Sequence, residues 1–377
     1  MGKHLVIVGG GHAHMLLLEN IASIVAKGHR VTVVGPSDYH FYSGMGPGML
    51  GGTYTPGDIR FATADVVRDQ GGVFVRDRVV AVDPDKRSVV TEAGETLAYD
   101  VISFNAGSYV PMDSVVGEGD RIYAVKPIEK LMEAGEKLTG LFRERRIKIA
   151  IVGGGPSSAE VAGNVWQLAK KVNRHMPVIQ VFAGTKFMSR FPRSIRARII
   201  SILEDRGIEI VEKGYVKRVE TGRITLDSGD SFTTDFTFMA LGVKPSSLFQ
   251  NSGLPLGPDR GILVNRFLQS TKYPEVFGGG DCIHFQDKPL DKVGVYAVRQ
   301  NPILVHNIMA TLGGDGPLKV FEPGPDYLLI FNLGGGQGVL KKKSVVFGGK
   351  IAFMIKDYID RRFMRRFQAI EKTSEKR

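Results

Sequence analysis

The stretch that decides the fold is Leu5–His14, with the sequence LVIVGGGHAH. An apolar run that leads into three glycines is typical of a buried parallel strand ending in a tight turn. A helical pattern follows from Met15 to Ala26, and a second apolar run occupies Val31–Val34. This order of strand, glycine turn, helix and strand predicts a dinucleotide-binding unit at the start of the chain.

The same plan recurs in the middle of the chain. Ile147–Ser158 (IKIAIVGGGPSS) is again an apolar run that leads into three glycines, and a helical pattern and the apolar run Val178–Phe182 follow it. Each unit later reaches an apolar strand that ends in small residues, at Val101–Gly107 and at Phe236–Gly242. A repeat on this scale predicts two related nucleotide-binding domains.

The first glycine turn suits a pyrophosphate but departs from the usual pattern. Glycine carries no Cβ that would keep the main chain from the phosphates, and the following helix offers unpaired N–H groups and its positive dipole end. His14 stands at the third glycine position, where a bulky residue is expected to loosen the packing of helix on strand. Gly35 replaces the acid that usually binds a ribose, and Ser37 or Asp38 could substitute for it.

The second glycine turn departs in the same two ways. Ser158 stands at the third glycine position, and Ala183 occupies the place of the ribose-binding acid. Two cations follow at Lys186 and Arg190. They favour a 2′-phosphate, hence NADPH, unless the second site is vestigial.

Composition limits the classes of function. The 377 residues predict two to three domains, and 43% hydrophobic with 24% charged residues is a normal globular mixture. Cys282 is the only cysteine, which excludes an internal disulfide and any mechanism through the chain's own dithiol, and fits a reducing compartment. Without a secretory signal or an apolar run of membrane-spanning length, the expected location is the cytoplasm.

The charge excess is local. The net charge is +11, and the basic residues concentrate in Arg190–Arg206 and in Lys341–Arg377. The first of these stretches contains no recognisable nucleic-acid-binding module, so we expect a helix of the second domain and no nucleic-acid partner. His12 and His14 lack carboxylate or cysteine partners nearby, so no metal site is predicted and the two rings are expected to line the glycine turn or pack under it.

The C-terminal stretch Lys350–Phe367 predicts a basic amphipathic helix. Its apolar ridge recurs every four residues (Ile355, Ile359, Phe363, Phe367) beside two pairs of arginines, although Lys356 falls inside the apolar arc. Such a helix can lie on an anionic bilayer, here the inner face of the membrane. It can equally pack on its own domain or on a second copy of the chain, so a homodimer stays open.

Several stretches together resemble a known family. They are Gly9–His14, Tyr42–Gly48, Gly153–Glu160, Val276–Cys282, Gly294–Gln300 and Lys356–Met364, which span nearly the whole chain in the family's order. The chain resembles the FAD-dependent pyridine nucleotide-disulfide oxidoreductase superfamily, in the branch of type II NADH dehydrogenases and sulfide:quinone oxidoreductases. It is most similar to the flavoprotein module fused to selenide water dikinase.

The resemblance implies an α/β fold with two Rossmann-like dinucleotide-binding domains, glutathione-reductase-like, the second inserted in the first, plus a C-terminal amphipathic helix. The implied boundaries are residues 1–115 and 250–340 for the FAD-binding domain, 116–249 for the NAD(P)-binding-like domain, and 341–377 for the basic tail. Lys126-Pro127 resembles the interdomain crossing near the flavin, or is a plain hinge.

The resemblance also implies the site residues. Implied FAD contacts are Gly9, Gly11, His12, Ala13, Ser37, Ser43, Gly44, Ala106, Gly107, Gly280 and Asp281. Implied NAD(P) contacts are Gly153, Gly155, Pro156, Ser157 and Gly242. Implied catalytic residues are Glu160, near the nicotinamide, and Tyr296 and Gln300, on the flavin face where the acceptor binds. For Glu160 the alternative is a first-turn acid placed for the helix dipole.

The cysteine count then selects a reaction. Sulfide:quinone oxidoreductases and disulfide reductases use cysteine pairs, whereas hydride transfer from NAD(P)H to FAD and onward to a quinone needs no protein nucleophile. We therefore expect FAD as cofactor, NAD(P)H as donor and a quinone or another small acceptor. Two alternatives remain: a flavin oxidoreductase with another small donor in sulfur or selenium metabolism, and a non-enzymatic flavin-binding redox partner.

Overall fold

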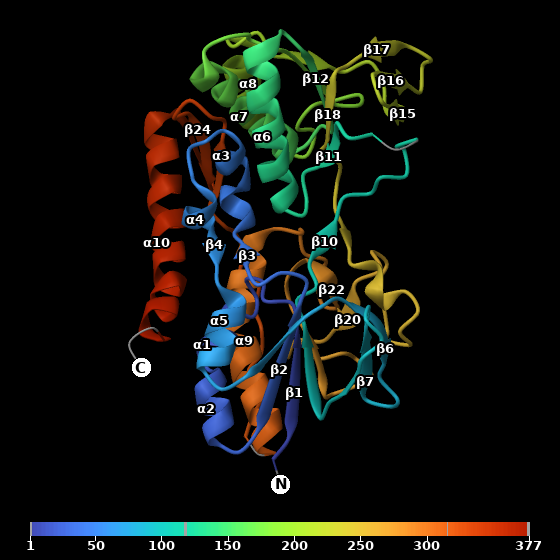
Figure 1. Ribbon diagram of the computed structural model, residues 1–377, viewed down its shortest axis with the longest axis vertical. Coiled ribbons are helices and arrows are strands. Elements are labelled where there is room, and N and C mark those ends of the chain that lie inside the picture. The colour runs from blue at the N-terminus through green and yellow to red at the C-terminus, as the bar shows by residue number, and fades with distance from the viewer. Residues whose placement is uncertain (1, 117–118, 315, 375–377) are drawn as a thin grey trace.

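The computed structural model describes residues 2–116, 119–314 and 316–374 (Figure 1). Two parallel five-stranded sheets organise the chain. The first has the order β21-β9-β1-β2-β5. Its strands are β1 (His4–Val8), β2 (Arg30–Gly35), β5 (Val73–Arg76), β9 (Val101–Phe104) and β21 (Val276–Gly278).

The second sheet repeats this arrangement, with the order β11-β18-β12-β13-β14. Its strands are β11 (Ile122–Ala124), β12 (Lys148–Val152), β13 (Val178–Phe182), β14 (Glu209–Val211) and β18 (Phe236–Met239). All five lie in sequence between β9 and β21 of the first sheet. The predicted fold of two Rossmann-like domains, the second inserted in the first, is therefore confirmed. The exact domain boundaries remain a proposal.

Each sheet carries the same accessory elements. A three-stranded antiparallel meander precedes β9, and a second precedes β18. The meanders are β6 (Val79–Asp83), β7 (Ser88–Thr91) and β8 (Thr96–Ala98), and β15 (Val216–Glu220), β16 (Arg223–Leu226) and β17 (Ser231–Thr233). The main helices are α1 (Met15–Glu19), α2 (Ile21–Ala26), α6 (Glu129–Glu144), α7 (Pro156–Val172), α8 (Arg193–Glu204) and α9 (Gly294–Gly313).

The remaining elements are short and mostly belong to the connections. They are β3 (His40–Phe41), β4 (Arg60–Phe61), β10 (Ser108–Tyr109), β19 (Lys244–Pro245), β20 (Ile262–Val264), β22 (Ile283–Phe285), α3 (Gly46–Leu50), α4 (Pro56–Ile59), α5 (Thr63–Asp69) and the 3₁₀ turns Ser43–Met45, Ser247–Phe249 and Gly280–Cys282.

The helix expected over Met15–Ala26 is interrupted at Asn20, which separates α1 from α2. The Asn20 amide donates to the carbonyl of Leu16, 2.7 Å away. The side chain of Gln70 then bonds two backbone groups beside the break, donating to the Leu18 carbonyl and accepting from the Ala22 N–H. Side chains thus satisfy the backbone groups at a helix end, as helix termini require.

The C-terminal part forms its own unit. Strands β23 (Leu329–Asn332), β24 (Gly338–Lys342) and β25 (Val345–Gly349) make an antiparallel sheet, and α10 (Lys350–Ser374) packs on it. The predicted boundary between residues 340 and 341 falls inside β24, so we propose that this unit begins before β23. In Figure 1, α10 runs along one side of the molecule past elements of both halves.

Only part of the predicted apolar ridge of α10 faces the protein. Phe367 is buried and Phe363 is half-buried, whereas Ile359 is 41% exposed. Lys356, the residue that broke the apolar arc, is buried and pairs with Asp360 at 2.7 Å. The inward face of α10 is therefore partly ionic.

The sheet of the C-terminal unit approaches α7 at Gly163. A Cβ built on Gly163 would clash with the carbonyl of Leu333, which is backbone and cannot rotate away. Only glycine therefore lets α7 and the turn after β23 lie this close.

We expect Gly163→Ala to lower the free energy of unfolding by about 1–3 kcal/mol, because the packed backbone must shift. Gly140→Ala on α6 is the matched control, since its Cβ would meet nothing within 4 Å. That change should raise stability by up to about 1 kcal/mol through helix propensity. Thermal or denaturant unfolding measures both, and equal effects would contradict the close approach.

Candidate cofactor-binding and redox site

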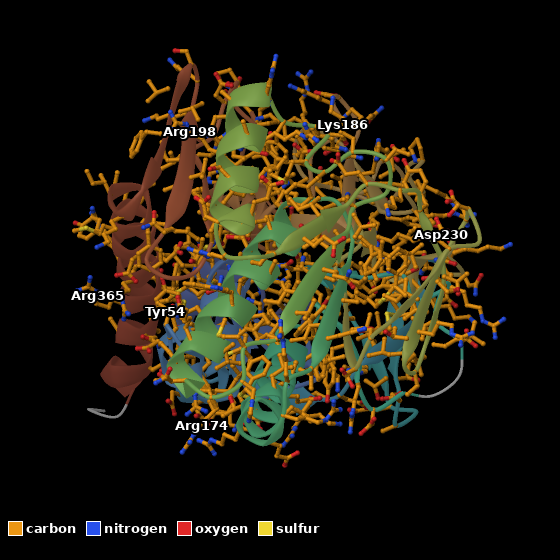
Figure 2. The ribbon with its side chains drawn as sticks, turned by 90° about the horizontal axis from the view of Figure 1, so that it is seen from above. Tyr54, Arg174, Lys186, Arg198, Asp230 and Arg365 are labelled. Atoms are coloured by element: carbon orange, nitrogen blue, oxygen red, sulfur yellow. The ribbon has the colours of Figure 1, made fainter. Side chains whose placement is uncertain are left out.

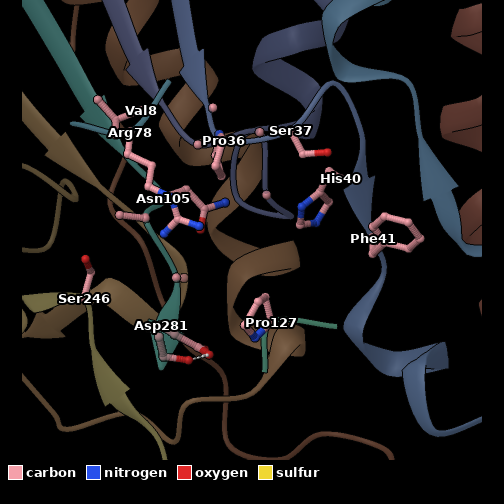
Figure 3. A pocket seen from close by; sticks show the side chains of 18 of the residues that line it. Val8, Pro36, Ser37, His40, Phe41, Arg78, Asn105, Pro127, Ser246 and Asp281 are labelled. Atoms are coloured by element: carbon pink, nitrogen blue, oxygen red, sulfur yellow. Dashed lines mark hydrogen bonds between the residues drawn. The ribbon is translucent and has the colours of Figure 1, made fainter. Parts of the chain in front are cut away.

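The carboxyl ends of the first sheet surround a cavity of about 600 Å³ (Figure 3). Parallel strands bring the residues that follow each of them to one edge, which is where open α/β sheets bind ligands. The cavity is also lined by Lys126–Glu129 and Ser246–Leu248, which follow the strands β11 and β18 of the second sheet. It therefore lies where the inserted domain joins the first.

The glycine turn after β1 forms one wall. Gly9 has a φ of +85°, and a Cβ there would clash with the carbonyl of Asn105 after β9. A Cβ on Gly11 would lie 2.6 Å from the Asn105 side-chain amide. The turn thus needs glycine to lie against β9, as the sequence pattern predicts.

His14 does not loosen this turn. Its ring is fully buried, with Nδ1 2.7 Å from the Gly9 carbonyl and Nε2 2.8 Å from the Ser103 hydroxyl. A carbonyl only accepts, so Nδ1 carries the proton and Nε2 accepts from Ser103. Burial lowers the pKa of His14 to about 4, which keeps the ring neutral. The bulky residue therefore bridges the strand and the turn.

Asp281 holds a half-buried ion pair at the other end of the cavity. Its Oδ2 accepts from Lys126 Nζ at 2.9 Å and from the Ser108 hydroxyl at 2.7 Å. Burial alone would raise the pKa of this carboxyl, but the Lys126 ammonium and the two hydrogen bonds outweigh it and lower the pKa. The predicted crossing residue Lys126 is thereby tied to the predicted flavin-binding aspartate.

Some buried polar atoms of the cavity wall have no hydrogen-bond partner among the described residues. They are His12 Nε2, His40 Nε2, Thr63 Oγ1 and Asn105 Nδ2. Burial lowers the pKa of His12 to about 3 and that of His40 to about 4, so both rings are neutral. Since buried polar groups normally find partners, these atoms are suited to a polar ligand.

The cavity wall near Gly35 contains an acid that the sequence pattern did not reveal. Asp77, directly after β5, lines the cavity, and its N–H donates to the Gly35 carbonyl at 3.0 Å. Of the two expected substitutes, Ser37 lines the cavity, whereas Asp38 pairs with Arg76 at 3.2 Å. Asp77 therefore stands beside the position where the usual acid is missing.

Most of the residues implied for FAD lie at this cavity. Those that line it are Gly9, Gly11, His12, Ser37, Ser43, Ala106, Gly107, Gly280 and Asp281. Ala13 is buried behind the turn, where it contacts Gly279, and the Gly44 carbonyl accepts from Lys356 at 2.8 Å. Their roles as FAD contacts stay a prediction.

Sequence reasoning missed His40, Thr63, Asp77 and Asn105. Asn105 and Asp77 directly follow β9 and β5, two strands of the parallel sheet. The rule that ligands meet the residues after parallel strands could have identified both. His40 and Thr63 lie in connections, and no pattern marks them.

The second glycine turn is built like the first. Gly153 has a φ of +141°, and a Cβ there would clash with the carbonyl of Ala240 at the end of β18. Gly155 caps α7, Pro156 begins it, and the Ser157 side chain is exposed. Gly242 follows β18 at the same edge. The structure thus brings the residues implied for NAD(P) to one edge, and their contacts stay a prediction.

Glu160 belongs to a buried ionic network. Its Oε1 accepts from the Asn332 N–H at 2.8 Å, and burial raises its pKa to about 6 despite the nearby Lys356 ammonium. The alternative of a first-turn acid is wrong, because α7 begins at Pro156 and Glu160 lies beyond its first turn. Lys356 in turn binds Asp360 and the Gly44 carbonyl.

Tyr296 and Gln300 lie beside the cavity rather than in its wall. Both line a separate space of about 10 Å³, the size of one water, which they share with Asp281. Gln300 Oε1 accepts from the Gly280 N–H at 2.7 Å, and Tyr296 packs against Tyr327. Gln300 thus positions the loop of Asp281, and a catalytic role for either residue stays a prediction.

Cys282 is fully buried beneath this loop. Its Sγ lies 3.2 Å from the Gly279 carbonyl, and burial raises the pKa of the thiol to about 11. A thiol in this state is a poor nucleophile, because the thiolate is the reactive form.

Comparison with known proteins agrees with this geometry. The profile of the family described as pyridine nucleotide-disulphide oxidoreductase matches residues 3–310. The chain belongs to this family. The type II NADH:quinone oxidoreductase of Staphylococcus aureus (strain NCTC 8325 / PS 47) is 24% identical over 395 residues, which cover 96% of this chain and 94% of that protein.

Solved structures show the same fold over the whole chain. NDH2 from Plasmodium falciparum in complex with NADH has a TM-score of 0.80 at 14% identity, covering 100% of this chain and 98% of that one. The sulfide:quinone oxidoreductase of Aquifex aeolicus has a TM-score of 0.77 at 16% identity, covering 98% and 92%. The recognised superfamily and branch, and FAD with a nicotinamide dinucleotide as cofactors, are confirmed at the level of the family.

The residues present fit FAD. The cavity is bordered by a glycine turn with no room for a Cβ, carries buried polar atoms without partners, and has an acid at each end, Asp77 and Asp281. No group of three or more histidine, cysteine and acidic side chains in the described residues is arranged to hold a metal ion.

The raised pKa of Glu160 makes stability depend on pH. The folded carboxyl has a pKa of about 6, against 4.5 as the ordinary value, so it favours folding below pH 4.5 and loses that contribution as the pH rises through 6. The loss amounts to about 2 kcal/mol. Glu160→Gln removes the titration and keeps an acceptor for Asn332.

The variant should therefore gain melting temperature relative to the wild type between pH 4.5 and pH 6.5. Glu136→Gln on the exposed side of α6 is the control and should run parallel to the wild type. Parallel curves for Glu160→Gln as well would show that its carboxyl titrates normally.

Proposed function

We propose that the protein is an FAD-dependent NAD(P)H:quinone oxidoreductase that works at a membrane surface. The observation that carries the proposal is the cavity between the first glycine turn and the Lys126–Asp281 pair, with the only cysteine buried below it. When bound there, FAD would accept a hydride and pass two electrons on. No side chain of the site can perform this chemistry.

The chain's own residues bind and orient in this scheme. The Gly9–Gly11 turn leaves room for phosphates, and Asn105, His12 and His40 offer polar atoms to the ligand. Lys126 places a positive charge beside Asp281, near the N-terminus of α9, and both favour negative charge nearby. Lys126 and the α9 N-terminus would therefore favour the electron-rich form of a ligand held next to them.

Glu160 and Lys356 are proposed to handle protons for the acceptor. Reduction of a quinone takes up two electrons and two protons. A carboxyl whose pKa is about 6 can bind and release a proton near neutral pH. Lys356 also contacts Gly44, next to Ser43 in the cavity wall, so the network reaches the edge of the site.

Buried Cys282 supports direct hydride transfer over thiol chemistry. The structural similarity to a sulfide:quinone oxidoreductase extends to the fold, but a nucleophilic mechanism needs a thiolate and a second cysteine. Neither is available in this chain.

The flavin spectrum tests the proposal. Purified protein should show flavin absorption, which NADH or NADPH bleaches without oxygen and a short-chain quinone restores. Cys282→Ser should retain turnover within about twofold, since no thiol takes part. Bleaching by sulfide alone would favour the alternative donor, and no bleaching by any of these donors would favour a non-enzymatic redox partner.

The outer face of α10 is proposed to bind an anionic bilayer, where quinones dissolve. Its exposed apolar residues are Ile351, Met354, Tyr358 and Ile359. Further along the same face Arg362 and Arg365 are exposed, and Figure 2 shows Arg365 pointing away from the body. This amphipathic face suits an interfacial position. No helix in the described ranges has the length and apolar character to cross a membrane.

Met354→Glu combined with Tyr358→Glu should abolish sedimentation with vesicles that contain anionic lipid, because both side chains leave water on binding. Val73→Glu is the control, since Val73 is 58% exposed on β5, away from α10. Binding of the wild type should weaken with salt. Equal binding of the double variant would refute the docking face.

A further inference from the structure

The carboxyl end of β13 shows which nicotinamide dinucleotide the second glycine turn suits. In this fold the residue after this strand binds the ribose farthest from the nicotinamide, through an acid for NADH or a nearby cation for NADPH. Ala183 stands there, and its N–H donates to the Val211 carbonyl at 2.9 Å. No acid occurs anywhere from Val178 to Arg190.

The carboxylate that follows β14 is already engaged. Glu212 follows β14, and its Oε1 accepts from the Phe187 N–H at 2.5 Å and from Arg196 at 2.7 Å. The hydrogen bond from Phe187 and the charges of Arg196 and Lys186 lower the pKa of this carboxyl against the effect of burial. Its charge is thus paired with that of Arg196.

Three cations at the same place have no ion-pair partner among the described residues: Lys186, Arg190 and Lys213. All three are exposed. Lys186 precedes Phe187 and Lys213 follows Glu212, so the hydrogen bond between Phe187 and Glu212 joins the loops that carry them. Lys186 lies at the molecular surface in Figure 2.

The loop of Lys186 and Arg190 is docked on the glycine turn itself. The Met188 N–H donates to the Gly154 carbonyl at 2.7 Å, and Gly184 pairs with Gly214 across the two loops. Tyr215, 62% exposed, flanks Gly184 and offers a flat ring beside the cations. The positive surface is therefore held next to the turn that receives the dinucleotide.

We propose that Lys186, Arg190 and Lys213 bind the 2′-phosphate of NADPH, which makes NADPH the preferred donor. The proposal rests on the proposed function, because it assumes that the second turn binds a nicotinamide dinucleotide. A phosphate monoester carries nearly two negative charges and three acceptor oxygens, which suit three unpaired cations. A ribose with two hydroxyls needs an acceptor carboxylate. Of the two nearby acids, Glu212 accepts from Phe187 and Arg196, and Asp227 accepts from the Tyr215 N–H at 3.1 Å.

Two measurements on the FAD-loaded protein test the proposal. Calorimetry compares adenosine 2′,5′-bisphosphate with adenosine 5′-monophosphate, and stopped-flow bleaching compares NADPH with NADH. The wild type should prefer the 2′-phosphorylated member of each pair by about tenfold or more. Lys186→Ala and Arg190→Ala should each lose about tenfold for that member and leave the other unchanged.

Arg198→Ala on the exposed side of α8 is the matched control and should change neither preference. Ala183→Asp should move the preference toward NADH by restoring the acid. A wild type that prefers NADH, or the monophosphate, overturns the inference and leaves the proposed function intact. If neither nucleotide bleaches the flavin, the proposed function is overturned. Binding of adenosine 2′,5′-bisphosphate then still tests the phosphate site.

Discussion

The close approach of a glycine to the end of a neighbouring strand is the constraint on which both halves of the molecule depend. Gly9 lies against the carbonyl of Asn105, and Gly153 lies against that of Ala240. In each half the contact holds the turn across the edge of a parallel sheet, so that the residues after several strands meet there. A Cβ at either glycine would push the turn outward and open this edge. The repeat in the sequence is therefore a repeat of one steric requirement.

The two copies of this arrangement differ in the charged residues around them. The first places carboxylates at its ends, with Asp281 compensated by Lys126 across the domain connection. The second compensates its carboxylate Glu212 internally and leaves cations outward. We propose that these charges suit a ribose at the first edge and a phosphate at the second. The side chains after the strands decide specificity, whereas the glycines decide only the architecture.

The fold and the glycine turns could be predicted from the sequence, because apolar runs, glycine triplets and their repeat are local patterns. Contacts between distant segments could not. The pattern marked His14 as a defect, but its ring finds Ser103 on a strand far along the chain. It marked Lys356 as misplaced, but its partners are Asp360 one turn on and Gly44 in the first domain. In both cases the polar atom is satisfied by a residue that no local window contains.

Burial of the Lys356–Asp360 pair costs free energy of desolvation, and the position of the pair on α10 shows what the pair contributes instead. Burying two charges requires desolvation that their attraction barely repays, so such a pair seldom adds stability over apolar packing. The pair instead fixes the position of α10 along the molecule. In only one position of the helix can Lys356 donate to the Gly44 carbonyl while Asp360 accepts from the Tyr42 hydroxyl. A wholly apolar interface would let α10 pack at more than one position along the molecule. The Lys356–Asp360 pair fixes α10 against the wall of the cavity while the outer face of the helix stays exposed. The face that we propose to bind a bilayer is therefore held in a defined place beside the cavity.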